Sequence, residues 1–383
     1  MKCRGIDLIS GEPLALSFSG VIESADVILA PQPEDGNAFL APGFIDLQVN
    51  GFGGVDYNRP EISEEEIQRS LEVQFATGVT RLYPTIITGS HERITGALRT
   101  LVKARATAPD GLAMEGFHVE GPFISPEDGP RGAHPVSWVR PPDIEEFRRF
   151  QDAAEGHVRL MTVSPEWPEA PAFIEAATRE GVVISIGHTK ASAQQIADAV
   201  SAGATMSTHL GNGAHAVLQR HPNYLWDQLA EDRLTASFIV DGIHLGPAFL
   251  KSALRAKGLE RSVLVTDAVM PAGCAPGPYE LGEVKVELHE DGSVRLAGGT
   301  RLAGSALRMD HAVANVIRLA GMSLRDAVTL ATRNPGRAGR VSGRQRGLVP
   351  GDRADIVRFQ FEDGAVRILE TWCGGKKVYA AAA

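Results

Sequence analysis

Cysteine is scarce in this chain, and its few cysteines lie far apart. The three of them, Cys3, Cys274 and Cys373, form no C-x-x-C pair among the 383 residues. Such spacing argues against a disulfide framework and against a zinc site built from thiolates. The scarcity favours a reducing compartment, so we expect the protein in the cytoplasm.

Long apolar runs, a signal segment, internal repeats and blocks of one charge are missing as well. No run approaches the roughly 18 apolar residues of a membrane helix, and residues 1–7 lack the apolar core of a secretory signal. Lys and Arg number 38 and Asp and Glu number 47, which leaves a formal net charge of −9. We therefore expect neither a membrane nor a nucleic acid as a partner.

What the sequence does contain is a series of eight short apolar runs, each closed by a polar residue. They span residues 44–50, 80–84, 116–120, 158–163, 182–188, 205–209, 236–241 and 263–267. Several stretches between them have helical patterns, and Ser63 and Glu66 form a capping box at the start of one. Gly203 is placed to end a second stretch, and Asn334-Pro335 to end a third.

The alternation of these runs with helical stretches indicates the fold class. Buried strands that alternate with helices predict parallel α/β units. Eight units in roughly 220 residues predict a (β/α)8 TIM-like barrel, whose typical size is about 250 residues. The alternative is a doubly wound sheet with a G-x-G-x-x-G turn after its first strand, a pattern that residues 51–54 do not follow.

Both ends of the chain differ from this pattern. Residues 1–41 contain short strand-like pieces, and residues 354–369 have the pattern of a β-hairpin with its turn at 362–364. We expect residues 1–41 and 341–383 to pair into one small β-sandwich domain. This domain would lie beside a barrel that spans residues 42–340.

Polar residues at the ends of the expected strands predict a metal site, because barrel strands end in one shared mouth. Glu120, His188 and His209 supply one carboxylate and two imidazoles, which with an open position for water form the ligand set of a catalytic zinc site. Asp267, on a fourth strand, is placed to act as general base for that water. One such histidine alone is more often an ordinary hydrogen-bonded residue, but four polar residues on four strands favour the site.

The loops beyond these strand ends contribute His134, Arg220 and His244. The remaining histidines have no comparable placement, and we interpret them as surface or structural residues: His91, His157, His215, His221, His289 and His311. For His215 and His221 this interpretation stays open, because they share a loop with His209.

Short motifs along the chain carry a resemblance to known enzymes. Pro42-Gly43-Phe44-Ile45-Asp46 resembles the amidohydrolase superfamily. Seven further motifs follow in order: Glu120-Gly121-Pro122-Phe123, Gly132-Ala133-His134, Gly187-His188-Thr189, Thr208-His209-Leu210, Asp241-Gly242-Ile243-His244, Val265-Thr266-Asp267-Ala268 and Leu302-Ala303-Gly304-Ser305. Together they are similar to the N-acetylglucosamine-6-phosphate deacetylase family, and the resemblance runs from about residue 40 to about residue 357.

The resemblance implies a single metal ion in each subunit. Glu120, His188 and His209 match the family's ligands, with zinc as the first choice of metal and iron(II) as the alternative. Most superfamily members carry a His-x-His for a second metal where this chain has Gln48 and Asn50. Neutral amides are poor ligands for a divalent transition ion, so we expect one metal, with weak binding of a second left open.

The resemblance also implies the roles of the remaining site residues. Asp267 would accept a proton from water and return it to the departing amine, and His134 would stabilise the developing oxyanion. Arg220 would bind the phosphate of N-acetyl-D-glucosamine 6-phosphate across a dimer interface, which implies a homodimer. Other substrate contacts would come from Gln48, Ala133, Asn212, Gly213, His244 and Leu302.

The loop from His209 to Asn223 departs from the family's pattern. Gly211 stands where the family commonly has an aromatic residue, and Gly213-Ala214 stands in place of Ala-Met. The departure favours an alternative substrate, another N-acyl amino sugar or an N-acyl amino acid. A non-catalytic amidohydrolase-like binding protein is a further alternative, but such a protein would be expected to lose the ligands or the base.

Overall fold

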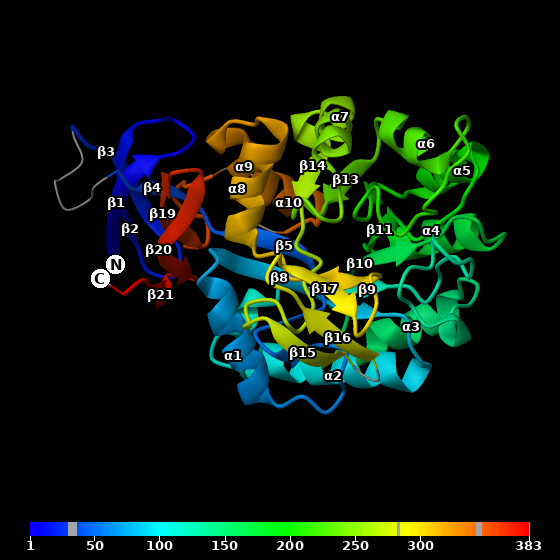
Figure 1. Cartoon of the computed structure of the whole chain (residues 1–383). Helices are drawn as coiled ribbons and strands as arrows, with labels where there is room; N and C mark the ends of the chain where they lie inside the picture. Colours follow the sequence, from blue (N-terminus) through cyan, green and yellow to red (C-terminus); the bar gives the residue numbers. More distant parts are fainter. Residues whose placement is uncertain (30–36, 282–283, 342–346, 383) are drawn as a thin grey trace.

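The computed structural model describes residues 1–383 except 30–36, 282–283, 342–346 and 383. Eight parallel strands form its centre (Figure 1), hydrogen-bonded in this order: β5 (Phe44–Val49), β8 (Val79–Ile87), β9 (Phe117–Glu120), β10 (Val158–Val163), β11 (Val183–Ile186), β12 (Met206–Ser207), β13 (Thr235–Phe238) and β14 (Ser262–Leu264). Each of the eight apolar runs overlaps one of these strands. The predicted barrel is therefore confirmed.

The barrel closes between its first and last strands. Asp267 N donates to Gln48 O at 2.9 Å, and Asn50 N donates to Ala268 O at 2.7 Å. These bonds lie just beyond the end of β14, so closure occurs at the C-terminal edge of the strands. The polar residues at the first and last strand ends are therefore brought side by side.

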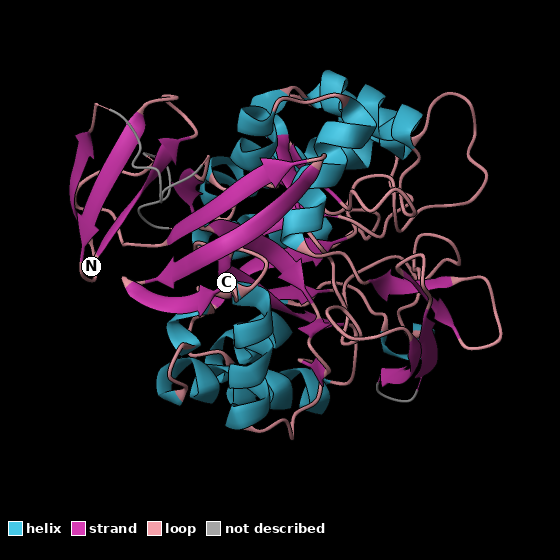
Figure 2. Ribbon diagram, turned by 60° about the vertical axis from the view of Figure 1, so that its left-hand side comes forward, coloured by secondary structure: helices cyan, strands magenta, loops and turns pink. Residues whose placement is uncertain are grey.

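Helices surround the barrel (Figures 1 and 2). They are α1 (Glu64–Phe75), α2 (His91–Thr107), α3 (Ile144–Ala153), α4 (Ala170–Arg179), α5 (Ala193–Ala202), α6 (Tyr224–Ala230), α7 (Pro247–Lys257), α8 (Met309–Ala320), α9 (Leu324–Ala331) and α10 (Arg333–Ala338), with 3-10 turns at Gly111–Ala113, Val136–Trp138 and Leu259–Arg261. The capping box of Ser63 and Glu66 and the left-handed Gly203 are confirmed. The prediction that Asn334-Pro335 ends a helix is wrong. Helix α9 ends earlier, at Ala331, and Pro335 lies in the first turn of α10, where the missing N–H has no intrahelical partner to lose.

Both ends of the chain join in one seven-stranded sheet, which Figure 2 shows beside the barrel. Its strands are β1 (Lys2–Asp7), β2 (Pro13–Phe18), β3 (Ile22–Val27), β4 (Phe39–Pro42), β19 (Ile356–Glu362), β20 (Ala365–Cys373) and β21 (Lys376–Ala380). Strand β4 joins the two ends, because it pairs parallel with β1 and antiparallel with β19. Phe18 and Trp372 pack edge to face, with ring centres 5.7 Å apart. The exact domain boundaries at residues 42 and 341 stay a prediction.

A small four-stranded antiparallel sheet was not predicted. Its strands are β15 (Gly277–Leu281), β16 (Val284–Leu288), β17 (Ser293–Leu296) and β18 (Leu302–Ser305), and a short hairpin, β6 (Gly51–Phe52) with β7 (Val55–Asp56), follows β5. Side chains of the four-stranded sheet form a separate apolar cluster around Val286 and Val294. In Figure 1 this inserted sheet lies over the barrel. Among the described residues, no helix has both the length and the apolar composition needed to cross a membrane.

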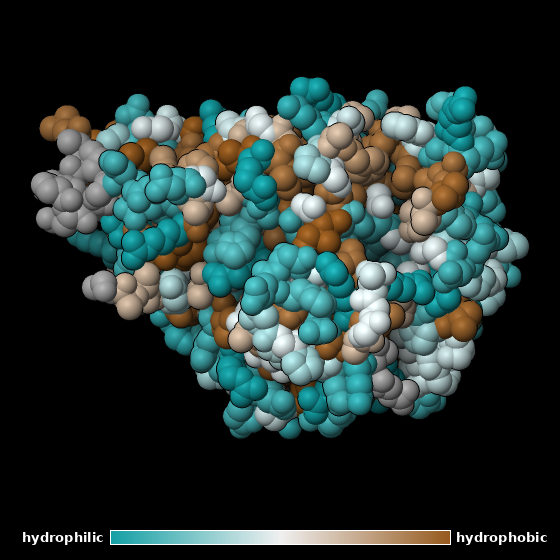
Figure 3. All heavy atoms as spheres, viewed as in Figure 1, coloured by the Kyte–Doolittle hydropathy of each residue, from teal (hydrophilic) through white to brown (hydrophobic). Residues whose placement is uncertain are grey.

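Figure 3 shows one face of the molecule in the same orientation as Figure 1. Hydrophilic side chains cover much of this face, and the hydrophobic ones visible between them are interspersed. Such a mixed surface is ordinary for a folded domain and by itself indicates no partner.

Candidate active site

Four predicted site residues lie at the C-terminal ends of barrel strands. Glu120 is the last residue of β9, and His188, His209 and Asp267 follow β11, β12 and β14 within three residues. The backbone of these three has positive φ, at 48°, 28° and 48°. Positive φ is strained for residues other than glycine, and such strain is concentrated at functional sites. The sharp bends turn the three side chains into the barrel mouth, where His188 and His209 are buried and Asp267 is half-buried.

Three ligand-type atoms converge at this mouth. Glu120 Oε1 lies 2.9 Å from His209 Nε2 and 3.2 Å from His188 Nε2, and the two imidazole nitrogens are 3.1 Å apart. His188 Nδ1 donates to Pro130 O at 2.8 Å, so its Nε2 presents a lone pair to the mouth. Bonds of about 2.0–2.1 Å at tetrahedral angles would place neighbouring ligand atoms about 3.3 Å apart. The three atoms therefore fit the ligand shell of one small divalent cation.

The Glu120 carboxyl is held in its charged form. Burial would raise the pKa of Glu120, but the interactions with the adjacent His188 and His209 rings outweigh burial and hold it well below the ordinary value. A charged carboxylate beside two imidazoles is suited to metal binding.

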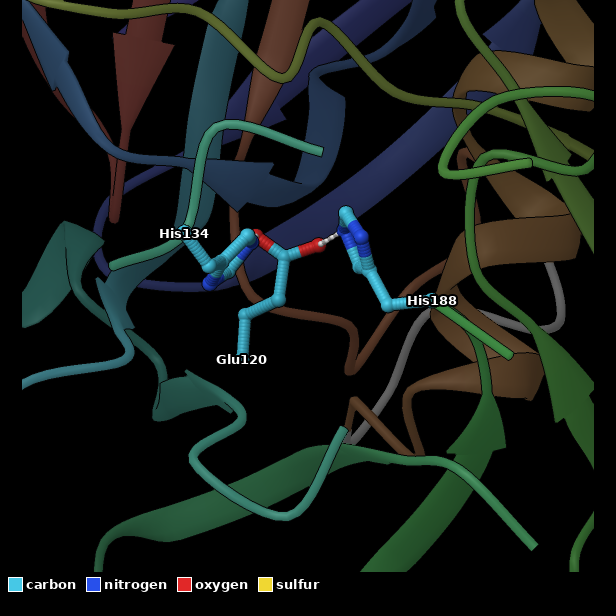
Figure 4. A group of neighbouring side chains, drawn as sticks. All are labelled: Glu120, His134 and His188. Carbon is cyan, nitrogen blue, oxygen red and sulfur yellow. Dashed lines mark hydrogen bonds and ion pairs between the residues drawn. The ribbon is translucent and has the colours of Figure 1, made fainter. Parts of the chain in front are cut away.

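His134 lies on the other side of the same carboxylate, as Figure 4 shows. Its Nε2 is 4.0 Å from Glu120 Oε2, and its Nδ1 is 2.8 Å from Thr88 Oγ1. Burial lowers the pKa of His134 to about 3, so the ring is neutral. One ligand atom each from Glu120, His134 and His188 lies within 4.8 Å of the others, and this cluster could hold a metal ion. His134 and His209 are therefore both candidates for the third ligand, and His209 is the nearer to the carboxylate.

Two side-chain amides donate to the carboxylates of the site, and one of them, that of Gln48, bridges the two. Gln48 Nε2 donates to Glu120 Oε1 at 2.9 Å and to Asp267 Oδ1 at 3.1 Å, and Asn50 Nδ2 donates to Asp267 Oδ1 at 2.7 Å. Burial raises the pKa of Asp267 to about 6, and the charge of Glu120 adds to that effect. Amide donors thus face the carboxylates at the position that histidines would occupy in a two-metal site.

A cavity of about 520 Å³ opens above these residues. Of the predicted substrate contacts, Ala133, Asn212, Gly213, His244 and Leu302 line it, and so does His134, the predicted oxyanion donor. Gln48 lies among the carboxylates and is not among the lining residues. His244 is held by Asp241, whose Oδ2 is 2.6 Å from His244 Nδ1. Arg220 lies outside this cavity, with its side chain exposed, and no ion pair joins it to another described residue.

Three arginines that sequence reasoning missed line the same cavity: Arg93, Arg131 and Arg301. Arg131 and Arg301 both approach Asp128 Oδ1, at 3.2 and 3.3 Å, so they lie close to each other at the rim. A signal was available for two of them, since Arg131 directly precedes the motif that ends in His134, and Arg301 directly precedes Leu302.

The unusual glycines of the loop after β12 have a steric explanation. A Cβ atom at Gly213, whose φ is +56°, would lie 2.7 Å from His188 Nδ1. A Cβ at Gly211 would lie 2.7 Å from Leu245 Cδ2 and 2.8 Å from Phe249 Cε1. Phe249 of α7 therefore fills the space beside Gly211, and Gly213 lets the loop backbone approach a proposed metal ligand.

Comparison with known proteins shows the family of this chain. The amidohydrolase family model matches residues 39–378. The chain belongs to the amidohydrolase family. Among related amidohydrolases, the N-acetylglucosamine-6-phosphate deacetylase of Bacillus subtilis (strain 168) is 32% identical over 324 residues, which cover 84% of this chain and 80% of that protein. The N-acetylgalactosamine-6-phosphate deacetylase of Escherichia coli O157:H7 is 31% identical over 93% of this chain and 92% of that protein.

Solved structures agree with this assignment. A variant of the N-acetyl-D-glucosamine-6-phosphate deacetylase from Mycobacterium smegmatis, in complex with N-acetyl-D-glucosamine-6-phosphate, gives a TM-score of 0.86. It is 31% identical, and the match covers 96% of this chain and 94% of that chain. The resemblance inferred from the sequence motifs and the barrel fold are both confirmed.

Proposed function

We propose that this amidohydrolase removes the acetyl group from N-acetyl-D-glucosamine 6-phosphate and releases D-glucosamine 6-phosphate and acetate. The observation that carries the proposal is the convergence of Glu120, His188, His209 and Asp267 in one mouth, in a chain related to deacetylases over most of its length. A non-catalytic binding protein would have no need to keep this set intact.

Glu120, His188 and His209 would hold one divalent ion, with zinc as the first choice and iron(II) as the alternative. Such an ion acidifies a water molecule and polarises a carbonyl group. Gln48 and Asn50 orient Asp267 through its Oδ1. A single metal is supported by these amides, since both direct N–H groups at the carboxylates.

Asp267 accepts the proton of the attacking water and gives it to the amine nitrogen as the C–N bond breaks. Its pKa near 6 suits both steps at neutral pH, because the group can hold and release a proton there. His134 faces the mouth with Nε2 while Thr88 can donate to Nδ1 at 2.8 Å. In that tautomer Nε2–H is a donor, which is suited to the oxygen of the acetyl group as it becomes negative.

Arg220 would bind the 6-phosphate, with further substrate contacts from Ala133, Asn212, Gly213, His244 and Leu302. Arg220 lies outside the cavity of its own chain, which supports a homodimer in which it reaches the neighbouring site. We propose the cytoplasm as the location of this enzyme.

A second candidate is the galacto epimer, N-acetyl-D-galactosamine 6-phosphate. It is favoured by relatives named for that substrate at 31% and 34% identity and by the altered loop around Gly211. An assay of free amine release on both epimers, with and without the 6-phosphate, distinguishes the candidates. Faster turnover of the phosphorylated gluco sugar supports the proposal, faster turnover of the galacto sugar favours the second candidate, and no release from any of them overturns both.

A further inference from the structure

The loop that presents Arg220 is closed at its base by two residues. Tyr224, the first residue of α6, is 6% exposed, and its hydroxyl accepts the backbone N–H of His215 at 2.8 Å. The same hydroxyl lies 3.0 Å from His215 Nδ1. The loop of residues 216–223 therefore begins and ends beside the contact between His215 and Tyr224. Arg220 is exposed between the two ends of this loop.

With a neutral His215 ring, every donor in this arrangement has an acceptor. The Tyr224 hydroxyl accepts from His215 N and can donate its own proton to Nδ1, which leaves the ring proton on Nε2. That Nε2 lies 2.9 Å from Glu127 Oε1 and can donate to it. We name Glu127, His215 and Tyr224 the clasp.

The clasp also joins two loops of the barrel mouth. Glu127 lies in the loop that leads to His134, and a Cβ atom at Gly129 in that loop would lie 3.1 Å from His215 Cα. The two loops are therefore packed in direct contact. His215 is held from both sides, by Tyr224 and by Glu127.

The loop between the ends of the clasp has little other support. Its side-chain hydrogen bonds among the described residues stay local: Gln219 Nε2 donates to His221 O at 3.0 Å, and Asn223 Nδ2 donates to Gln219 O at 2.9 Å. Val217 is 88% exposed, and only Leu218 packs toward the core. Pinning the two ends limits the conformations of such a segment, which lowers the entropy lost when it binds.

We propose that His215 and Tyr224 are positioning residues, which order residues 216–223 so that the Arg220 guanidinium is presented to the substrate phosphate. The inference rests on the proposed function for the identity of that phosphate. Neither residue lines the cavity of its own chain. They would act through Arg220, so their effect should appear in substrate binding and hardly in turnover.

The test is Tyr224→Phe, which removes one hydroxyl and keeps the ring. KM for the phosphorylated N-acetyl sugar should rise roughly 3- to 10-fold, the value of about one hydrogen bond, while kcat and the activity on the unphosphorylated sugar stay near wild type. Amide hydrogen exchange of residues 216–223 in the metal-loaded enzyme should become faster. Tyr83→Phe is the matched control. It also removes a buried hydroxyl, which donates to Gly339 O at 2.6 Å, but this bond involves no residue of the loop.

A double variant decides whether the clasp acts through Arg220. In an Arg220→Ala background, Tyr224→Phe should cause no further rise in KM, because the group that it positions is already absent. An equal rise in both backgrounds, or wild-type exchange of residues 216–223 in both Tyr224→Phe and His215→Ala, would overturn the proposal. A wild-type enzyme that releases no amine would instead contradict the proposed function, and the exchange measurement would still test the clasp.

Discussion

Gln48 donates a hydrogen bond to Glu120 at 2.9 Å, and it does so to Oε1, the same oxygen that the two strand-end histidines approach. One carboxylate oxygen therefore faces an amide on one side and two imidazoles on the other. An amide N–H group repels a cation, so a metal ion has room only on the imidazole side.

We expect the purified protein to carry about one equivalent of metal per chain. Elemental analysis should show that His188→Ala and His209→Ala lose this metal together with activity, because each removes one of three protein ligands. His134→Ala should keep the metal and lose turnover. If His134→Ala loses the metal while His209→Ala keeps it, the third ligand is His134. Two tightly held metals per chain would contradict the role of Gln48 and Asn50.

Asp267→Asn should keep the metal and lose activity. The change removes the proton acceptor while keeping the size of the side chain, and general acid–base groups are typically worth about 10²- to 10⁴-fold in rate. Turnover and metal content measured on the same sample check this. A variant with wild-type kcat would rule out Asp267 as the base.

Arg220→Ala should raise KM for the phosphorylated sugar by roughly 10- to 100-fold, since a hydrogen bond to a charged group is worth about 1.5–3 kcal/mol. Activity on the unphosphorylated sugar should hardly change, because that substrate has no phosphate for the guanidinium. Arg301→Ala is the matched control, since Arg301 lines the cavity of its own chain. A larger loss in Arg301→Ala would mean that the phosphate is bound within one chain.

Mixing Arg220→Ala chains, which should bind the phosphorylated sugar weakly, with inactive Asp267→Asn chains tests whether Arg220 serves a neighbouring site. A mixed dimer has one site with both residues intact if Arg220 is supplied by the partner. Recovery of activity at low substrate concentration after subunit exchange supports this. If the mixture is no more active than the sum of its components, Arg220 acts within its own chain.

Gly213→Ala should weaken metal binding and activity. The new Cβ would lie 2.7 Å from His188 Nδ1 and would push this ring from its place. Positive φ alone costs roughly 1–2 kcal/mol in any residue with a Cβ. Gly321→Ala controls for this cost, because Gly321 is left-handed with φ +76°, and a Cβ added there would meet only the flexible Lys251 Nζ at 4.0 Å. Equal metal content in both variants would exclude the contact with His188.

Asp46 should make the folded state less stable as the pH rises. This buried carboxyl accepts hydrogen bonds from Thr266 and from Gln48 N, but burial outweighs them and raises its pKa to about 7. Its folded-state pKa exceeds the ordinary value of 3.8, so its contribution to stability is complete below pH 4 and is lost as the pH rises through 7. Urea unfolding should show a slope of up to about 1.4 kcal/mol per pH unit that Asp46→Asn removes. Equal slopes in both proteins would contradict the raised pKa.

The barrel and most of its site could be predicted from local sequence patterns. Each strand is a short apolar run, and a polar residue at the end of such a run needs no long-range information to be recognised. Once eight parallel strands are inferred, closure alone brings Glu120, His188, His209 and Asp267 into one mouth, because all strand ends lie on the same edge. This is why the candidate ligands could be named before any distance was known.

Only the tertiary structure decided which residues form hydrogen bonds with these side chains. Gln48 and Asp267 are 219 residues apart, and their hydrogen bond depends on the closure of the barrel. The inserted sheet of β15–β18 escaped prediction. Half-buried and exposed residues alternate along β15, and the apolar side chains of the sheet form a small cluster separate from the barrel core. The position of Arg220 outside its own cavity and the contact of His215 with Tyr224 likewise arise from packing between loops. Local patterns determine which segments form strands and helices, whereas hydrogen-bond partners are chosen by which side chains the closed barrel brings within about 3 Å of one another.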